Sequence, residues 1–187
     1  MKRFFDLISS LLAIVIFIIP MIFIALMIKA DSKGPILFTQ KRVGKDGKLF
    51  NIYKFRTMKM DTPNVSTEDL GNPAVYITEV GKLLRKTSMD ELPQLFNILK
   101  GDMSIVGPRP ALYNQYNLIA MRDELGISSI RPGLTGYAQV MGRDLITDEK
   151  KVEYDYIYLK NSNIFFDLKI IWFTVFSVIK AEGVRLK

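Results

Sequence analysis

The sequence predicts an α+β protein, mainly helical, with a short β-hairpin and an apolar N-terminal helix that inserts into a membrane. Leu7 to Ile28 is almost entirely apolar and long enough to cross a bilayer. Two segments with strand signals then flank one turn signal, and much of the rest has helical spacing. We therefore divide the chain into a membrane-inserted helix, residues 1–30, and a membrane-associated domain on the cytoplasmic side, residues 31–187.

Composition limits the classes of protein to consider. A chain of 187 residues with 49% hydrophobic content fits one domain and a membrane element. The net charge of +7 favours either a nucleic acid or an anionic membrane surface as partner, and the apolar N-terminus favours the membrane. The chain has no cysteine and no histidine. Covalent chemistry must therefore use a carboxylate, hydroxyl or amine, and a tight metal site must have oxygen ligands.

The N-terminal segment is too long for a cleaved signal peptide and lacks a small-x-small cleavage site. Pro20 lies inside it and predicts a kink, because proline removes a helical hydrogen bond. Basic residues flank both ends, Lys2-Arg3 on one side and Lys29, Lys33, Lys41 and Arg42 on the other. A helix bent at Pro20 would return to the same side and keep both clusters cytoplasmic. A simple kinked transmembrane helix fits the residues equally well.

The predicted hairpin joins strands Pro35–Val43 and Leu49–Met58 around the turn Lys45-Asp46-Gly47-Lys48. Alternation places Lys54 and Arg56 on one face of the second strand. Two cations on one face can bind phosphate, and they can equally be solvated surface charge.

Turn formers in Asp61–Pro73 predict a mobile loop. The helices that we expect after it cover Val75–Lys86, Asp90–Lys100 with Gly101 as the cap, Tyr113–Leu125, Asp148–Lys160 and Ile164–Ala181. The last is apolar over most of its circumference, so it is either a buried core helix or an interfacial helix in the headgroup region.

The adjacent carboxylates Asp90 and Glu91 are the central candidates for chemistry. Capping is the structural alternative, because Ser88 and Glu91 match a capping box. Pro93 argues against that register and favours a helix that starts at Asp90, with the proline in the first turn. Asp90 would then lie at the positive end of the helix dipole, which favours an ionised carboxylate. Such a group can attack phosphorus or bind Mg²⁺.

Four arginines offer planar guanidinium groups suited to a diphosphate: Arg85, Arg109, Arg131 and Arg143. Surface salt bridges would explain each of them singly. Glycine or proline stands beside Arg109, Arg131 and Arg143 and constrains the backbone there. Together with the acidic pair, these arginines indicate phosphoryl transfer.

Several ordered blocks of the chain closely resemble the bacterial sugar transferases, and more narrowly the small monotopic phosphoglycosyl transferases. The blocks, which extend over nearly the whole chain, are Phe38-Thr-Gln-Lys-Arg-Val-Gly44, Tyr53-Lys-Phe-Arg-Thr-Met58, Asp90-Glu-Leu-Pro-Gln-Leu-Phe-Asn97, Lys100-Gly-Asp-Met-Ser-Ile-Val-Gly-Pro-Arg-Pro110 and Arg131-Pro-Gly-Leu-Thr-Gly136 with Ala138-Gln-Val140.

The resemblance implies an enzyme of the bacterial inner membrane, with its catalytic domain on the cytoplasmic face. It would move a sugar-1-phosphate from a UDP-sugar to undecaprenyl phosphate, with release of UMP, at the start of glycan or glycoconjugate assembly. Asp90 would be the nucleophile that carries the phosphosugar, and Glu91, with Asp90, the ligand of Mg²⁺. Arg109 would bind the diphosphate. Weaker candidates for substrate binding are Lys54, Arg56, Arg85, Arg131, Arg143 and Asp155.

The family also implies a re-entrant helix broken at a Ser-Pro pair, where this chain has Ile19-Pro20. Two other classes of function compete with the enzyme. A silent membrane adaptor would explain the anchor and the charge but not the acidic pair. A nucleic-acid binder is disfavoured, because the basic residues are dispersed and no reading motif is present. The identity of the sugar and the oligomeric state stay open, including self-association through the last helix.

Overall fold

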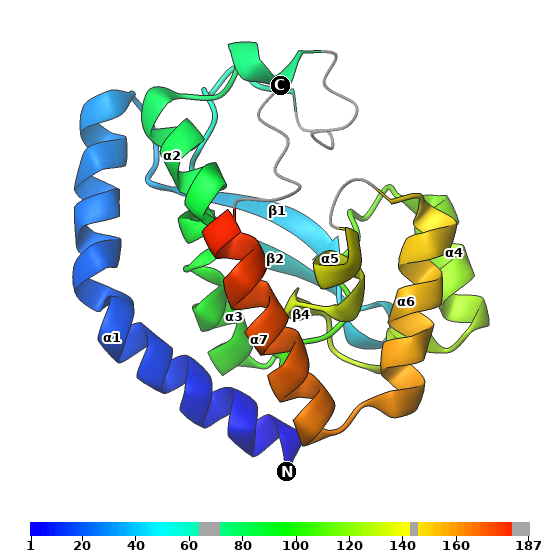
Figure 1. Cartoon of the computed structure of the whole chain (residues 1–187). Helices are drawn as coiled ribbons and strands as arrows, with labels where there is room; N and C mark the ends of the chain where they lie inside the picture. The colour runs from blue at the N-terminus through cyan, green and yellow to red at the C-terminus, as the bar shows by residue number, and fades with distance from the viewer. Residues whose placement is uncertain (64–71, 143–145, 181–187) are drawn as a thin grey trace.

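The computed structural model describes residues 1–63, 72–142 and 146–180, in which helices pack around two small sheets (Figure 1). This confirms the mainly helical α+β class with a β-hairpin and a long apolar N-terminal helix. In chain order the elements are α1 (Lys2–Asp31), β1 (Leu37–Val43), η1 (Lys45–Gly47), β2 (Leu49–Phe55), η2 (Pro73–Val75), α2 (Glu79–Thr87), η3 (Met89–Glu91), α3 (Gln94–Lys100), β3 (Ser104–Val106), α4 (Tyr116–Glu124), η4 (Ile127–Ser129), β4 (Gly133–Thr135), α5 (Tyr137–Gly142), α6 (Asp148–Asn161) and α7 (Ile164–Lys180), where η marks a 3₁₀ helix.

Helix α1 runs along one side of the other elements and continues through Pro20 (Figure 1). Its most apolar window has a mean hydropathy of 3.2, and only 17% of that window is buried against protein. By length and composition it is the one helix among the described residues that could cross a membrane. Met21, Ile24 and Ile28 are its buried apolar residues, and they pack with Phe55 and Leu84.

Polar contacts fix the N-terminal end of α1 to the rest of the protein. Arg3 donates to the carbonyl oxygens of Ile98 at 2.6 Å and Leu99 at 3.0 Å, at the C-terminal end of α3. The carboxylate of Asp6, which is only 2% exposed, accepts hydrogen bonds from the Ser104 hydroxyl and the Ile105 amide. The first turns of α1 are therefore part of the folded domain.

The predicted hairpin is confirmed. Strands β1 and β2 pair antiparallel from Leu37 opposite Phe55 to Val43 opposite Leu49. The turn needs positive φ, which Asp46 and Gly47 adopt at 55° and 72°, and short polar residues and glycine tolerate this conformation best.

Asn97, fully buried in α3, binds the backbone of β2. Its side chain accepts from the Tyr53 amide at 3.0 Å and donates to the Asn51 carbonyl at 2.8 Å. This bond pair fixes α3, and with it the segment that carries the acidic pair, against the hairpin.

The parallel pair β3 and β4 was not predicted. Ser104 pairs with Gly133 and Val106 with Thr135, and the backbones come unusually close beside this pair. A Cβ at Gly133 would lie 2.2 Å from the Gly107 amide nitrogen, so only glycine fits there.

Several predicted helix boundaries were wrong. Helix α2 begins at Glu79 and not at Val75, and the Thr78 side chain accepts the Gly81 amide as its N-cap. The helix predicted from Asp90 is divided into η3 and α3, with Pro93 at the N-cap of α3. Helix α4 begins at Tyr116, whereas the predicted helix began at Tyr113. The predicted mobile loop, Asp61–Pro73, lies mostly outside the described residues.

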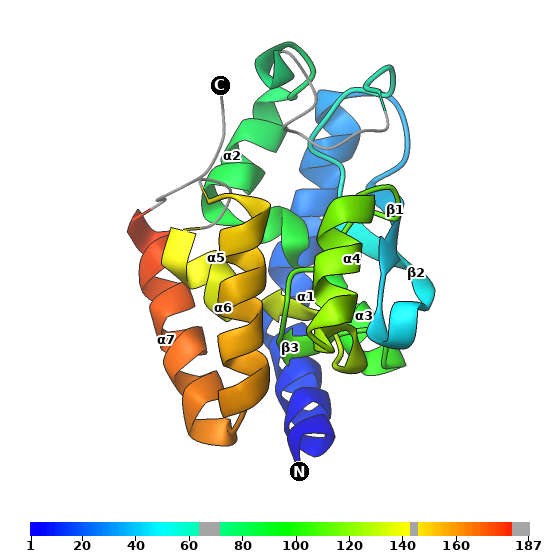
Figure 2. The same ribbon diagram turned by 90° about the vertical axis from the view of Figure 1, so that its right-hand side faces the viewer.

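Helix α5 packs against both α6 and α7 (Figure 2), and Tyr158 of α6 contacts Phe166 and Asp167 of α7. Both helices match their predicted segments. On α7, Asp167 and Ile170 are buried, whereas the opposite face exposes Phe165, Leu168, Trp172, Phe173, Val175 and Phe176. The alternative of a buried core helix is thereby wrong, because α7 is a surface helix with an aromatic outer face.

Candidate active site

The acidic pair lies in η3, a single turn between α2 and α3. The chain enters this turn through Ser88, whose φ of 56° is left-handed. The Ser88 side chain makes no capping hydrogen bond, so the capping-box alternative is not what the structure shows. Asp90 is 9% exposed, and the Glu91 side chain is 16% exposed.

Two cations from distant parts of the chain meet at Glu91. Lys54 on β2 approaches its Oε1 atom at 2.7 Å, and Arg109 approaches the same atom at 2.9 Å. Lys54 is largely buried, with 18% of its side chain exposed, whereas 41% of the Arg109 side chain is exposed. The predicted candidates Lys54, Glu91 and Arg109 are therefore brought together in one cluster beside Asp90.

The environment separates the pKa values of the two carboxyl groups. Burial alone would raise the pKa of Glu91, but the charges of Arg109 and Lys54 and their hydrogen bonds outweigh it and hold that pKa far below its usual range. For Asp90, burial dominates and raises the pKa, the charge of Glu91 acts in the same direction, and Lys54, Arg85 and Arg109 oppose it. Glu91 is thus held as a carboxylate, while Asp90 is a buried group with unfavourable desolvation.

Arg85 lies close enough to lower the pKa of Asp90 by its charge. Its Nε donates to the Thr57 hydroxyl at 3.1 Å. Arg85 at the C-terminal end of α2 is therefore a third cation of the cluster, on a helix that packs against η3.

The structure places other predicted residues away from this cluster. Arg56 is buried and donates to the carbonyls of Ser32 and Lys33, after α1. Arg131 donates to the Gly101 carbonyl at 2.8 Å. Both guanidinium groups thus bind backbone, and their predicted contact with substrate stays a prediction. Arg143 lies outside the described residues.

Asp155 is only 1% exposed and forms an ion pair with Arg122 at 2.6 Å. Burial raises the pKa of Asp155, and the charge of Arg122 partly offsets this rise. Arg122 also donates from Nη1 to the Arg109 carbonyl at 2.9 Å. Asp155 is therefore connected to the acidic cluster through Arg122 and the backbone of Arg109.

Sequence reasoning missed Arg122 and the role of Arg42. Burial lowers the pKa of Arg42 to about 10, Arg109 adds to the lowering and Glu91 opposes it. Arg42 is therefore electrically coupled to the cluster. Its place in the block Phe38–Gly44 was a signal, whereas nothing local distinguishes Arg122 from a surface arginine.

The donor set at Asp90 and Glu91 suits Mg²⁺, although no group of three or more metal-binding side chains gathers within the described ranges. Mg²⁺ is commonly held by one or two carboxylates together with water and substrate phosphates. Lys54 and Arg109 both contact Glu91 at Oε1. Asp90 and Glu91 are the residues here that could hold such an ion.

A family model and several individual relatives assign the chain to the same family. The bacterial sugar transferase model matches residues 1–181. The chain is 40% identical over 185 residues to the uncharacterized sugar transferase EpsL of Bacillus subtilis, covering 99% of this chain and 90% of that protein. It is also 40% identical to the exopolysaccharide production protein PSS of Rhizobium leguminosarum bv. phaseoli, covering 95% and 94% of the two chains.

Relatives whose names state an activity are longer. The UDP-glucose:undecaprenyl-phosphate glucose-1-phosphate transferase of Klebsiella pneumoniae is 40% identical over 182 residues, which are 94% of this chain but 39% of that protein. With the family model matched over nearly its whole length and two relatives of similar size, this chain belongs to the bacterial sugar transferase family.

Proposed function

We propose that the chain transfers a sugar-1-phosphate from a UDP-sugar to undecaprenyl phosphate and releases UMP. Relatives named for this transfer to undecaprenyl phosphate share 36–40% identity with nearly all of the chain. The observation that carries the proposal is the buried Asp90 beside Glu91, a carboxylate on which Lys54 and Arg109 converge. A diphosphate needs such a concentration of positive charge close to a nucleophile.

In the first step, a carboxylate oxygen of Asp90 attacks the β-phosphorus of the UDP-sugar. The bond between this phosphorus and the bridging oxygen breaks, UMP leaves with the electron pair, and the phosphosugar stays on Asp90 as an acyl phosphate. In the second step, an oxygen of undecaprenyl phosphate attacks the same phosphorus and releases the Asp90 carboxylate. A phosphate nucleophile is already ionised, so the second step needs no general base.

The cations near Asp90 fit this sequence. Arg109, with 41% of its side chain exposed, can offer other N–H donors of its guanidinium to an incoming diphosphate while it stays paired with Glu91. Lys54 and Arg85 add positive charge near Asp90. Mg²⁺, bound by Asp90 and Glu91, would supply further charge neutralisation to the diphosphate. These positive charges would favour the ionised form of Asp90 against its burial.

The test is UMP release by purified protein with Mg²⁺, undecaprenyl phosphate and a panel of UDP-sugars. The panel includes UDP-glucose, UDP-N-acetylgalactosamine and UDP-galactose, because relatives are named for the corresponding sugars. We expect one or more donors to give UMP with the wild type and none with Asp90→Asn. Absence of UMP with every donor from folded protein would refute the proposal, and a silent membrane adaptor would then be favoured.

We further propose that α1 enters the cytoplasmic side of the membrane and returns to the same side. Arg3 and Asp6 bind the domain at one end of α1, and Arg56 binds the carbonyls of Ser32 and Lys33 just after the other end. A straight span would separate these two ends by the bilayer, whereas one domain contacts both. Pro20, in the apolar part, lowers the cost of a bend.

The natural absence of cysteine makes this topology directly measurable. Single cysteines at Lys2 and Lys33 should both be protected from a membrane-impermeant thiol reagent in intact cells and both react after the membrane is opened. Labelling of the Lys2 position alone in intact cells would establish a spanning helix. The aromatic face of α7 is proposed to lie in the headgroup region of the same membrane surface.

A further inference from the structure

The loop that carries Arg109 has few backbone amide hydrogens that can donate a hydrogen bond. Prolines stand on both sides of Arg109, at 108 and 110, and proline has no amide hydrogen to donate. The carbonyl oxygens are therefore the main backbone groups by which this loop can be held. Two successive carbonyls, those of Arg109 and Pro110, each accept a hydrogen bond from a different arginine.

The two arginines reach the loop from different elements. Arg122 on α4 donates from Nη1 to the Arg109 carbonyl at 2.9 Å, and Arg42 on β1 donates from Nη1 to the Pro110 carbonyl at 3.1 Å. A backbone hydrogen bond also joins the loop to the hairpin, because the Val43 amide donates to the Ala111 carbonyl at 3.0 Å. The loop is thus held between the hairpin and α4.

Each arginine is itself fixed by a buried acceptor. Asp155 accepts from Nε and Nη2 of Arg122 at 3.0 and 2.6 Å through one oxygen, Oδ2. Gln40, which is 7% exposed, accepts from Nη2 of Arg42 at 2.7 Å. Side chains with several fixed hydrogen bonds lose little further freedom when they hold the loop.

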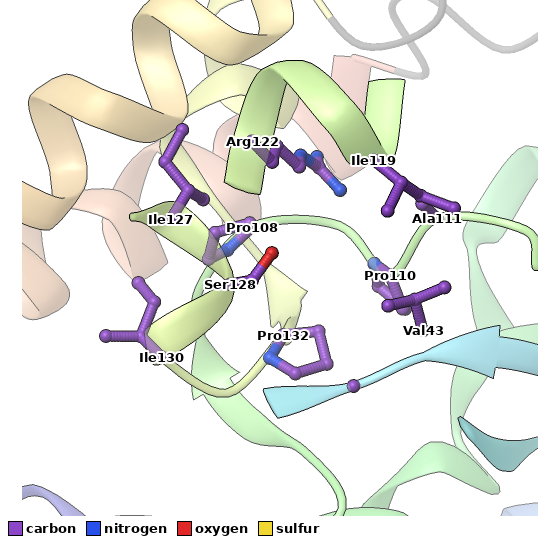
Figure 3. Close-up of a pocket in the computed structure, with 11 residues that line it drawn as sticks. Val43, Pro108, Pro110, Ala111, Ile119, Arg122, Ile127, Ser128, Ile130 and Pro132 are labelled. Atoms are coloured by element: carbon purple, nitrogen blue, oxygen red, sulfur yellow. The ribbon is translucent and has the colours of Figure 1, made fainter. Parts of the chain in front are cut away.

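A small pocket lies beside the loop. It has a cavity volume of about 30 Å³, and it opens to solvent on one side. Pro108, Pro110 and Arg122 line it, with Ile119, Ile127 and Pro132 around them (Figure 3). The hydrogen bonds from Arg42 and Arg122 therefore restrain the loop in addition to this packing.

We propose that Arg42 and the Arg122–Asp155 pair are positioning residues that hold the loop 107–111 so that the Arg109 guanidinium meets Glu91. The proposal rests on the proposed function, in which that guanidinium also meets the diphosphate of the substrate. Asp155 acts through Arg122 and the Arg109 backbone, and it does not touch the substrate.

The first test is a kinetic cycle with Asp155→Asn, which keeps the size of the side chain and removes its charge. UMP release should show a kcat lowered by about tenfold to hundredfold, the cost of misplacing a catalytic group by about 1 Å. In an Arg109→Gln background, the same change should alter kcat by less than about twofold, because the group being positioned is gone. Equal losses in both backgrounds would overturn the proposal.

Glu153→Gln is the matched control. It removes an ion pair with Lys150 from the same helix, α6, but on its exposed surface, and it should leave kcat unchanged. Arg42→Gln removes the hydrogen bond that reaches the loop from the hairpin. It should lower kcat in the wild-type background and have little effect in the Arg109→Gln background, as Asp155→Asn does. Agreement between the two variants separates loop positioning from damage peculiar to a buried carboxylate.

A second measurement does not depend on activity. The amides of Gly107, in the loop, and of Val43 and Leu112, beside it, are hydrogen-bonded. Their hydrogen exchange should become faster in Asp155→Asn and stay unchanged in Glu153→Gln. If wild-type protein releases no UMP, the proposed function fails, and hydrogen exchange alone tests whether these residues position the loop. Faster exchange would then support the positioning role, and unchanged exchange would overturn it.

Discussion

Replacing Glu91 by glutamine tests the electrostatics of the site, because it removes one charge and keeps the shape. Lys54 and Arg109 would then lie at 2.7 and 2.9 Å from a neutral group. Loss of one partner from a fully buried ion pair costs about 3–5 kcal/mol, whereas an exposed pair contributes about 0–1 kcal/mol. Arg109 is 41% exposed and can be solvated, while Lys54 is 18% exposed. We therefore expect a loss of about 2–3 kcal/mol.

For a chain of this size, such a loss lowers the thermal midpoint by about 4–12 °C. Circular dichroism of detergent-solubilised protein measures it. Glu79→Gln is the control, since its ion pair with Lys82 is exposed on both sides, and we expect at most about 0.5 kcal/mol there. Equal midpoints for the two variants would refute the inference that Glu91 is a buried charge held by two cations.

The stability difference between wild type and Glu91→Gln should also depend on pH. The pKa of Glu91 is lowered in the folded state, so its charged form stabilises the fold above its ordinary pKa of 4.5, and this stabilisation is lost as the pH falls below that value. The midpoint difference between wild type and Glu91→Gln should therefore be constant near neutral pH and shrink below pH 4.5. A difference that persists undiminished at pH 3 would contradict the assigned direction.

Three further predictions concern the catalytic pair, the fold and the metal. Asp90→Asn should lower UMP release by more than about a thousandfold without lowering the thermal midpoint at neutral pH, because burial raises the pKa of Asp90 and disfavours its charge; a clear loss of stability would contradict this. Asn97→Ala should cost about 2–3 kcal/mol, because it leaves the Tyr53 amide and the Asn51 carbonyl unpaired, whereas Asn161→Ala on the surface should cost under about 0.5 kcal/mol; equal midpoints would refute the role of Asn97. Excess EDTA should stop UMP release and added Mg²⁺ should restore it, and full activity in EDTA would refute the metal proposal.

Local patterns predicted the hairpin and most helices well. The alternation in β2 and the turn Lys45–Gly47 specify pairing between neighbouring segments, and this is a property of the sequence alone. The pair β3 and β4 was beyond such reasoning. Each strand has three residues, and Ser104 pairs with Gly133 far along the chain, so no periodicity reveals the contact.

Because local patterns do not reveal contacts between distant segments, the site was predicted only in part. The acidic pair, the strand alternation and the arginines beside proline or glycine singled out Asp90, Glu91, Lys54 and Arg109, the resemblance assigned their roles, and the fold gathers them. Neither the patterns nor the resemblance could tell which arginines bind neighbouring backbone. The carbonyl partners of Arg56 and Arg131 come from segments that lie far from them in sequence, and only the folded chain shows these contacts.

The most direct test is to locate the covalent intermediate. Protein incubated with its UDP-sugar and Mg²⁺, without undecaprenyl phosphate, is quenched, digested with trypsin and sequenced by mass spectrometry. The peptide Thr87–Lys100 contains both acidic residues, so fragment ions must distinguish them. We expect the mass of a sugar phosphate on Asp90, and none in Asp90→Asn. An adduct on Glu91 or on any other residue would contradict the assignment of Asp90 as the nucleophile.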